Sequence, residues 1–133
     1  MKKKVVSIIE KGEDGGYSIY AKDLPGTYGY GLTEEEAKSD FEEVLKEQLE
    51  YMQEKTGCES EYDANSVEYR YDFSGFFKAF PYFNVSELAK ELGVNSSLFR
   101  RYKSGSAQAS EKQKEKIQAY FDEMVKKLQA VKF

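Results

Sequence analysis

The sequence predicts an α+β protein built from two small domains. Short segments rich in β-branched residues and punctuated by glycine fill residues 1–72, whereas residues 73–133 show only helical spacing of apolar residues. The charge divides at the same place. Residues 1–72 carry 9 Lys or Arg against 18 Asp or Glu, a net charge of −9, and residues 73–133 carry 11 against 6, a net charge of +5. Such a split indicates two domains with different partners, and uneven charge on one domain is the alternative.

The composition excludes several classes of site. The 133 residues include no His and a single Cys. Imidazole bases, zinc sites built on His, intrachain disulfides and multi-thiolate metal sites are therefore excluded. No apolar run approaches the roughly 20 residues of a membrane span. The apolar residues after Lys2–Lys4 are also too few for a secretory signal, so we expect a cytoplasmic protein.

The first domain is expected to begin with three short strands. The β-branched residues of 4–10 indicate the first, and the glycine-rich turn at 12–16 permits a tight reversal into the second. Pro25 and Gly26 end the second strand, because proline lacks the N–H that a sheet needs. The strands expected in this domain are 4–10, 17–21, 27–31 and, after a helix, 67–71.

A long helix should separate the third and fourth strands. Thr33 and Glu36 fit a capping box, in which Thr33 is the N-cap and Glu36 reaches back to it. One apolar face follows at helical spacing, and its members are Ala37, Phe41, Val44, Leu45, Leu49 and Met52. Gly57 is expected to end this helix, and residues 58–66 are expected to form a loop. The predicted order is β-β-β-α-β.

The second domain is expected to be all-α. Helices are predicted over 73–80, 85–92 and 96–103, and a last helix is capped at Ser110. The last helix carries an apolar stripe that consists of Ile117, Tyr120, Phe121, Met124, Val125 and Leu128. This stripe either packs within the domain or forms the seam of a dimer.

Residues 85–105 fit two short helices that cross at a steep angle through a tight turn. Ala89 is small where the second helix passes, and Gly93 ends the first helix in a conformation that glycine adopts easily. Asn95 or Ser96 caps the second helix, and Gly105 ends it. The expected inward residues are Leu88, Leu92, Val94, Phe99 and Tyr102. The segment resembles the helix-turn-helix of the Cro and lambda-repressor type, and a purely structural αα-hairpin is the alternative.

That resemblance implies a DNA-binding surface. In such motifs the second helix enters the major groove and its first turns meet base edges. The residues expected there are Asn95, Ser96, Ser97, Arg100 and Arg101. Either arginine can pair bidentately with guanine. Lys103 and Ser104 are better placed for phosphate contacts. Three further lysines either add non-specific attraction or form an ordinary solvated helix face, and they are Lys112, Lys114 and Lys116.

Three motifs follow one another within residues 15–37, and they are Gly15-Gly16-Tyr17, Asp23-Leu24-Pro25-Gly26 and Thr33-Glu34-Glu35-Glu36-Ala37. Together they resemble the HicB antitoxin family. That family shows a Gly-Gly-aromatic strand, an Asp-Leu-Pro-Gly turn, a glycine-containing strand and a Thr-x-x-Glu-Ala helix start. The resemblance implies a partial ribonuclease H-like domain over 1–72, followed by a helix-turn-helix domain over 73–133. It further implies binding to HicA, a small basic toxin that cleaves mRNA, and repression of the protein's own operon. Helix-turn-helix proteins of this type generally act as dimers, so we expect a homodimer or higher even oligomer. The chain departs from the family pattern at Ala21-Lys22 and at Tyr28-Gly29-Tyr30.

We therefore expect an antitoxin and operator-binding repressor that is not an enzyme and needs no metal or cofactor. The resemblance assigns no particular residue to toxin contact. The alternative is a stand-alone regulator whose acidic domain senses a ligand or another protein. A degenerate nuclease is the least favoured reading, because the carboxylates show no nuclease spacing. Those considered are Asp14, Asp23, Glu34, Glu35 and Asp63.

Overall fold

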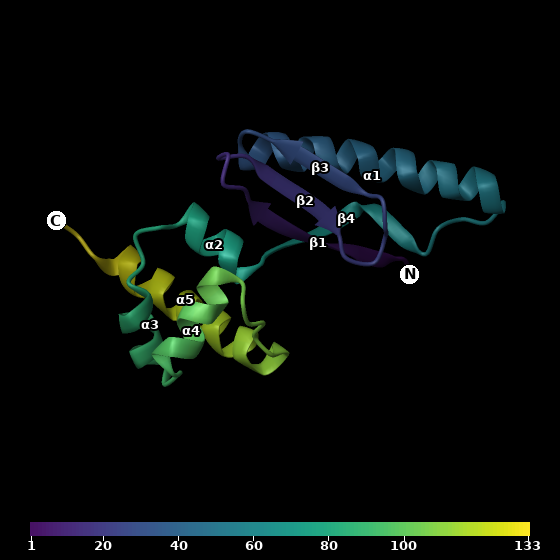
Figure 1. The fold of residues 1–133 in the computed structure, drawn as a ribbon. Coiled ribbons are helices and arrows are strands. Elements are labelled where there is room, and N and C mark those ends of the chain that lie inside the picture. The colour runs from purple at the N-terminus through teal and green to yellow at the C-terminus, as the bar shows by residue number, and fades with distance from the viewer. The chain divides into compact units, whose positions relative to one another are not determined.

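The computed structural model describes residues 1–133 and is an α+β fold with one four-stranded mixed sheet and five helices (Figure 1). The strands are β1 (Lys3–Lys11), β2 (Tyr17–Ala21), β3 (Tyr28–Gly31) and β4 (Tyr62–Tyr71). The helices are α1 (Glu34–Thr56), α2 (Phe73–Ala79), α3 (Val85–Leu92), α4 (Ser96–Ser104) and α5 (Glu111–Ala130). The chain forms two compact units, Met1–Phe80 (unit 1) and Pro81–Phe133 (unit 2). None of the helices combines the length and the apolar character needed to cross a lipid bilayer.

The sheet of unit 1 has the order β3-β2-β1-β4. β1, β2 and β3 form an antiparallel meander, and β4 pairs with β1 in parallel. A parallel pair needs a crossover connection, and α1 provides it between β3 and β4 (Figure 1). The predicted order β-β-β-α-β is confirmed for this part of the chain.

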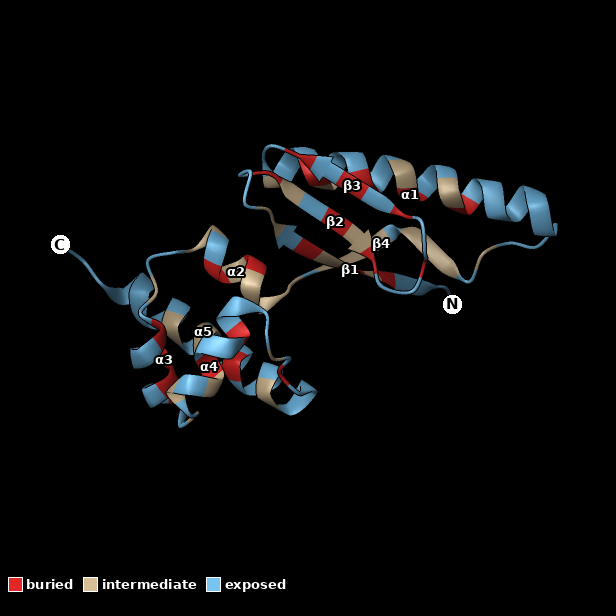
Figure 2. Cartoon of the chain, in the orientation of Figure 1, coloured by how far each residue is buried: buried red, intermediate tan, exposed pale blue.

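The core of unit 1 lies between α1 and one face of the sheet (Figure 2). Alternate residues of the strands point into it, as a period of two requires. Its buried members are Val5, Ile9, Ile19, Ala21, Leu24, Ala37, Phe41, Leu45 and Leu49. β3 contributes glycines instead of side chains. A Cβ on Gly29 would lie 2.5 Å from the Cα of Phe41, and one on Gly31 would lie 2.5 Å from the backbone nitrogen of Ala37. The backbone of α1 therefore rests directly on β3.

The predicted ends of α1 are confirmed. The Thr33 hydroxyl accepts a hydrogen bond from the Glu36 N–H at 3.1 Å, and Gly57 ends the helix with φ of 72°. The Glu36 carboxylate reaches back to the N–H of Leu32, at 3.1 Å, instead of to that of Thr33. The Asp40 carboxylate accepts from the N–H of Tyr30 at 2.9 Å. Side chains of α1 thus satisfy N–H groups on and just after the outer edge of β3.

The prediction of a loop over 58–66 is wrong in its second half, because β4 begins at Tyr62. Lys3 and Lys4 pair with Tyr62 and Asp63, and after a register shift Val5 pairs with Val67. The Asp63 carboxylate accepts from the N–H of Asn65 at 2.9 Å within this irregularity. A bulge of this kind breaks the alternation of apolar and polar residues, so the pattern of a strand is absent from the sequence there.

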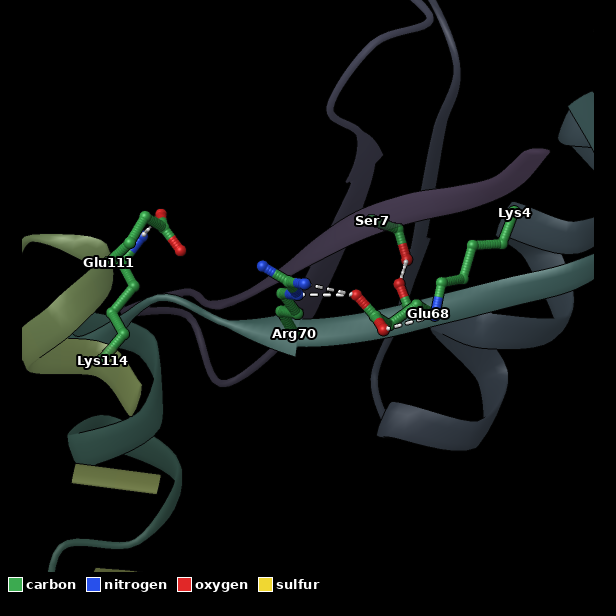
Figure 3. Close-up of polar contacts among 6 residues, drawn as sticks. All are labelled: Lys4, Ser7, Glu68, Arg70, Glu111 and Lys114. Carbon is green, nitrogen blue, oxygen red and sulfur yellow. Dashed lines mark hydrogen bonds and ion pairs between the residues drawn. The ribbon is translucent and has the colours of Figure 1, made fainter. Parts of the chain in front are cut away.

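Side chains near the bulge connect β4 to β1, and one further ion pair lies within β4 (Figure 3). The Ser7 hydroxyl, which is fully buried, donates to the Glu68 carbonyl at 3.1 Å. The Glu68 carboxylate accepts from the Lys4 ammonium at 3.1 Å and from the Arg70 guanidinium at 2.7 Å. These two donors, Lys4 first, lower the pKa of Glu68. The pairs are exposed, so they contribute to alignment more than to stability.

α2 belongs to unit 1, although the sequence places it at the start of the second domain. Asp72 caps the helix by accepting from the Gly75 N–H at 2.9 Å. A Cβ on Gly75 would lie 3.1 Å from the backbone nitrogen of Lys11, so α2 lies against the end of β1. The boundary between the compact units accordingly falls after Phe80, not after Asp72. The sequence alone did not indicate this boundary, because the point where strands give way to helices need not be the point where one hydrophobic core ends and the next begins.

Unit 2 is all helical, with a small core shared by α3, α4 and α5. Its buried residues are Val85, Leu88, Ala89, Leu92, Phe99, Tyr102, Ala109 and Ile117. Of the two predicted uses of the apolar stripe of α5, the structure shows packing within the unit for its first half only. Ile117 is buried and the Phe121 ring lies 5.7 Å from that of Phe83, whereas Val125 and Leu128 are 53% and 62% exposed. The first half of the stripe packs within the unit, and the second half remains open.

Candidate nucleic-acid interface

α3 and α4 are separate helices joined by a turn at Gly93, Val94 and Asn95. Gly93 has φ of 69°, which is the left-handed conformation. Its N–H donates to the Lys90 carbonyl at 3.2 Å, and the Val94 N–H donates to the Ala89 carbonyl at 2.9 Å. These two bonds are those of a Schellman motif, which ends a helix and turns the chain sharply. The predicted stop at Gly93 is confirmed.

The crossing of α3 and α4 depends on Ala89 and Phe99, both of which are completely buried. An alanine leaves the second helix room to approach, and the large ring of Phe99 fills the space between the helices. The other predicted inward residues also point into the unit. Leu88, Leu92 and Tyr102 are buried, and Val94 is half-buried.

Gly93→Ala should lower the free energy of unfolding of unit 2 by about 1 kcal/mol, because alanine in the left-handed conformation is strained. The effect should not exceed this, because a Cβ there would meet only the Lys116 Nζ, at 3.9 Å. Gly93→Asn should cost less, since asparagine tolerates this conformation. Urea melts followed by circular dichroism measure both. An alanine variant as stable as the wild type would mean that the turn adopts another backbone.

The outward face of α4 carries the polar residues that the sequence predicts. Ser97, Arg100, Arg101, Lys103 and Ser104 are exposed, and Ser96 is half-buried. Residues three and four apart share a helix face, so positions 97, 100, 101 and 104 form one row. Neither arginine makes an ion pair or a side-chain hydrogen bond. Both guanidinium groups are therefore available to an external acceptor.

Asn95 has a more specific role than the sequence alone defines. Of the two possible caps, Asn95 is the one used. Its side-chain oxygen accepts from the N–H groups of Ser97 and Leu98, at 2.9 and 3.2 Å. This oxygen is therefore occupied by the helix, and only the amide NH₂ remains for another acceptor. Ser104 is also engaged, because its hydroxyl donates to the Arg101 carbonyl at 3.2 Å.

The three lysines of α5 differ in their surroundings. Lys114 forms an ion pair with Glu111 at 3.3 Å (Figure 3), so its charge is partly neutralised. Lys112 and Lys116 are exposed and form no ion pair. The Lys116 ammonium lies beside Gly93, at the turn that precedes α4. The sequence did not single out Lys116 among the three, because the approach of α5 to this turn is a tertiary contact.

The arrangement suits the recognition of a planar or anionic polar surface. Two guanidinium groups on one helix face can each donate two parallel hydrogen bonds, to a guanine edge or to a phosphate. Lys103 and Lys116 add positive charge at the end of α4 and beside the turn. The chain has no group of three or more Asp, Glu or Cys side chains arranged to hold a metal ion.

No protein-family model, no curated protein and no solved structure matches this chain.

Proposed function

We propose that the protein is a DNA-binding repressor that also serves as the antitoxin of a small basic toxin. The observation that carries the DNA-binding half is the α3–turn–α4 unit, with its buried Ala89 and Phe99 and its outward row of Ser97, Arg100 and Arg101. A second helix with one face in the core and the other face rich in exposed arginine is the arrangement of a recognition helix.

In this proposal α4 enters the major groove and one or both arginines read guanine. Lys103 and Lys116 lie outside the groove and bind phosphates, which fixes the register of the protein on the duplex. A dimer places two such helices about 34 Å apart, one turn of DNA, on a pseudo-palindromic operator. The exposed Val125 and Leu128 of α5 are available for the dimer contact.

The test of the DNA-binding half is selection of the full chain on a random double-stranded DNA library at 150 mM salt. We expect enrichment of sites whose two inverted halves have centres about one helical turn apart. Affinity should also fall steeply with salt, because phosphate contacts release counterions. Binding without sequence preference would contradict the recognition role and leave only a basic surface.

The antitoxin half rests on the resemblance of residues 15–37 to the HicB family and on the charge of unit 1, which carries 10 Lys or Arg against 18 Asp or Glu. Such a surface complements a basic RNA-cleaving protein. Co-production with the product of a neighbouring short basic reading frame should restore growth that this product arrests. The absence of such a reading frame would favour a stand-alone regulator whose acidic unit senses a ligand or another protein.

A further inference from the structure

The sheet of unit 1 has one face against α1 and an opposite face that carries tyrosines. The glycines of β3 point to α1, so Tyr28 and Tyr30 point away from it. They are 65% and 48% exposed. The strand register continues this row with Tyr28 beside Tyr20, Tyr20 beside Ile8, and Ile8 beside Arg70 of β4, whose guanidinium is paired with Glu68. We call the part of this surface on β1, β2 and β3 the tyrosine face, and its members are Ile8, Glu10, Ser18, Tyr20, Tyr28 and Tyr30.

Tyr30 is held in place although it is exposed. Its hydroxyl donates to the Asp14 carboxylate at 3.0 Å, and the same carboxylate accepts from the Gly16 N–H at 3.0 Å. The ring passes over Gly16 so closely that a Cβ there would clash with the phenol oxygen of Tyr30. An aromatic side chain fixed in advance loses little entropy when a partner covers it, which is the property of an interface anchor.

Carboxylates border the tyrosines at one end of the face. The Asp14 carboxylate accepts a hydrogen bond from Tyr30. In the strand register, Ser18 lies between Glu10 on β1 and Tyr30 on β3. Hydrogen bonds from Gly16 and then Tyr30 lower the pKa of Asp14, so this group stays charged at neutral pH. Burial and then the charge of Asp72 raise the pKa of Glu10, and Lys78 offsets the rise only in part. A second cation near Glu10 and Asp72 would relieve their repulsion.

From these observations we infer that the tyrosine face docks a basic protein surface, with an arginine side chain stacked on Tyr28 or Tyr30 and paired with the adjacent carboxylates. A guanidinium group stacks on an aromatic ring and pairs with a carboxylate at the same time, which an ammonium does less well. The inference rests on the proposed function for the identity of its partner, a basic protein, and it names the surface that this partner covers.

A groove elsewhere on unit 1 fits this partner less well than the tyrosine face does. A groove of about 650 Å³ runs between α1 and β4 and is lined by Glu42, Glu43, Lys46 and Tyr69 among others. The ring of its tyrosine is already covered by a cation, because the Lys38 ammonium lies 4.8 Å from the centre of the Tyr69 ring. A lysine of the chain itself therefore occupies the position over the ring that a cation of a basic partner would use.

The test is a titration of the full, isotope-labelled chain with two peptides of equal charge, acetyl-(Gly-Arg)₄-amide and acetyl-(Gly-Lys)₄-amide. We expect the arginine peptide to bind about tenfold more tightly and to shift the backbone NMR signals of residues 14–20 and 28–30 most strongly. Tyr28→Ser combined with Tyr30→Ser should weaken the arginine peptide about tenfold and leave the lysine peptide little changed. The matched control, Glu43→Gln with Glu47→Gln on α1, removes two charges elsewhere and should spare the arginine preference.

Several outcomes would overturn the inference. Equal binding of the two peptides, or signal shifts centred on α1, would show that only the overall charge matters. Concentration-dependent shifts at residues 28–30 without peptide would show that a second copy of the chain covers the face. Binding of single-stranded RNA there would show a nucleic-acid platform. The growth-rescue experiment tests whether the chain has a toxin partner, whereas this titration replaces that partner by peptides and tests the surface alone, so the failure of one is distinguishable from the failure of the other.

Discussion

Replacing Arg100 and Arg101 together with alanine should reduce operator affinity at least about 100-fold and leave the fold intact. A bidentate arginine contributes roughly 1–3 kcal/mol of base discrimination, and both side chains lie on the exposed face of α4. Because both residues are exposed, thermal unfolding should be little changed. Gel-shift titration on the selected operator measures the affinity, and circular dichroism checks the fold.

The single variants separate the two arginines by role. Loss of the residue that reads a base should relax the sequence preference at one operator position. Loss of a phosphate contact should instead weaken binding to all sequences alike, and it should lower the slope of log affinity against log salt concentration by about 1. The matched control is Lys127→Ala with Lys132→Ala, which also removes two positive charges but far from α4 in the sequence. Unaltered affinity and preference in the double arginine variant would remove α4 from the interface.

Gly29→Ala should unfold unit 1 or reduce its free energy of unfolding by about 3 kcal/mol or more. The added methyl group would lie 2.5 Å from the backbone nitrogen and Cα of Phe41. Backbone atoms of a long helix cannot move aside individually, so α1 as a whole would have to lift from the sheet. The free energy of unfolding of a small domain is low, so a loss of this size is a large fraction of it. Urea melts of the full chain measure the change.

Two controls separate crowding from other effects in that experiment. Gly15→Ala introduces the same methyl group at φ of 89° with no atom within 4 Å, so it should cost only about 1 kcal/mol of conformational strain. Ser18→Ala changes the exposed face of the neighbouring strand and should be nearly neutral. A Gly29→Ala variant that melts with the wild type would contradict the direct contact between β3 and α1.

The features that the sequence predicted well are those with local causes. Thr33 and Gly57 set the ends of α1, Ser110 begins α5, and Gly93 separates α3 from α4. Each acts through a hydrogen bond or a backbone conformation within a few residues, so a short stretch of sequence contains the whole signal. The outward positions of Arg100 and Arg101 follow from the same local helical period.

The features that the sequence missed depend on distant partners. The first half of β4 needs Lys3 and Lys4 to pair with it, and its bulge removes the alternation that marks a strand. α2 joins unit 1 because it meets the end of β1, about 60 residues earlier in the chain. The approach of Lys116 to Gly93 and the setting of Tyr30 over Gly16 are likewise tertiary contacts. A glycine within a strand indicates that another segment of the chain packs closely against its backbone, but the sequence does not show which segment that is.

The central place of β1 has a consequence for synthesis of the protein. β1 leaves the ribosome before β2, β3 and β4, yet its parallel neighbour β4 is complete only at Tyr71, and closing such a long-range pair is slow. Until then one edge of β1 stays open and prone to pairing with other nascent chains. The three helices of unit 2 contact one another over shorter stretches of chain, so they can pack together as soon as they have left the ribosome.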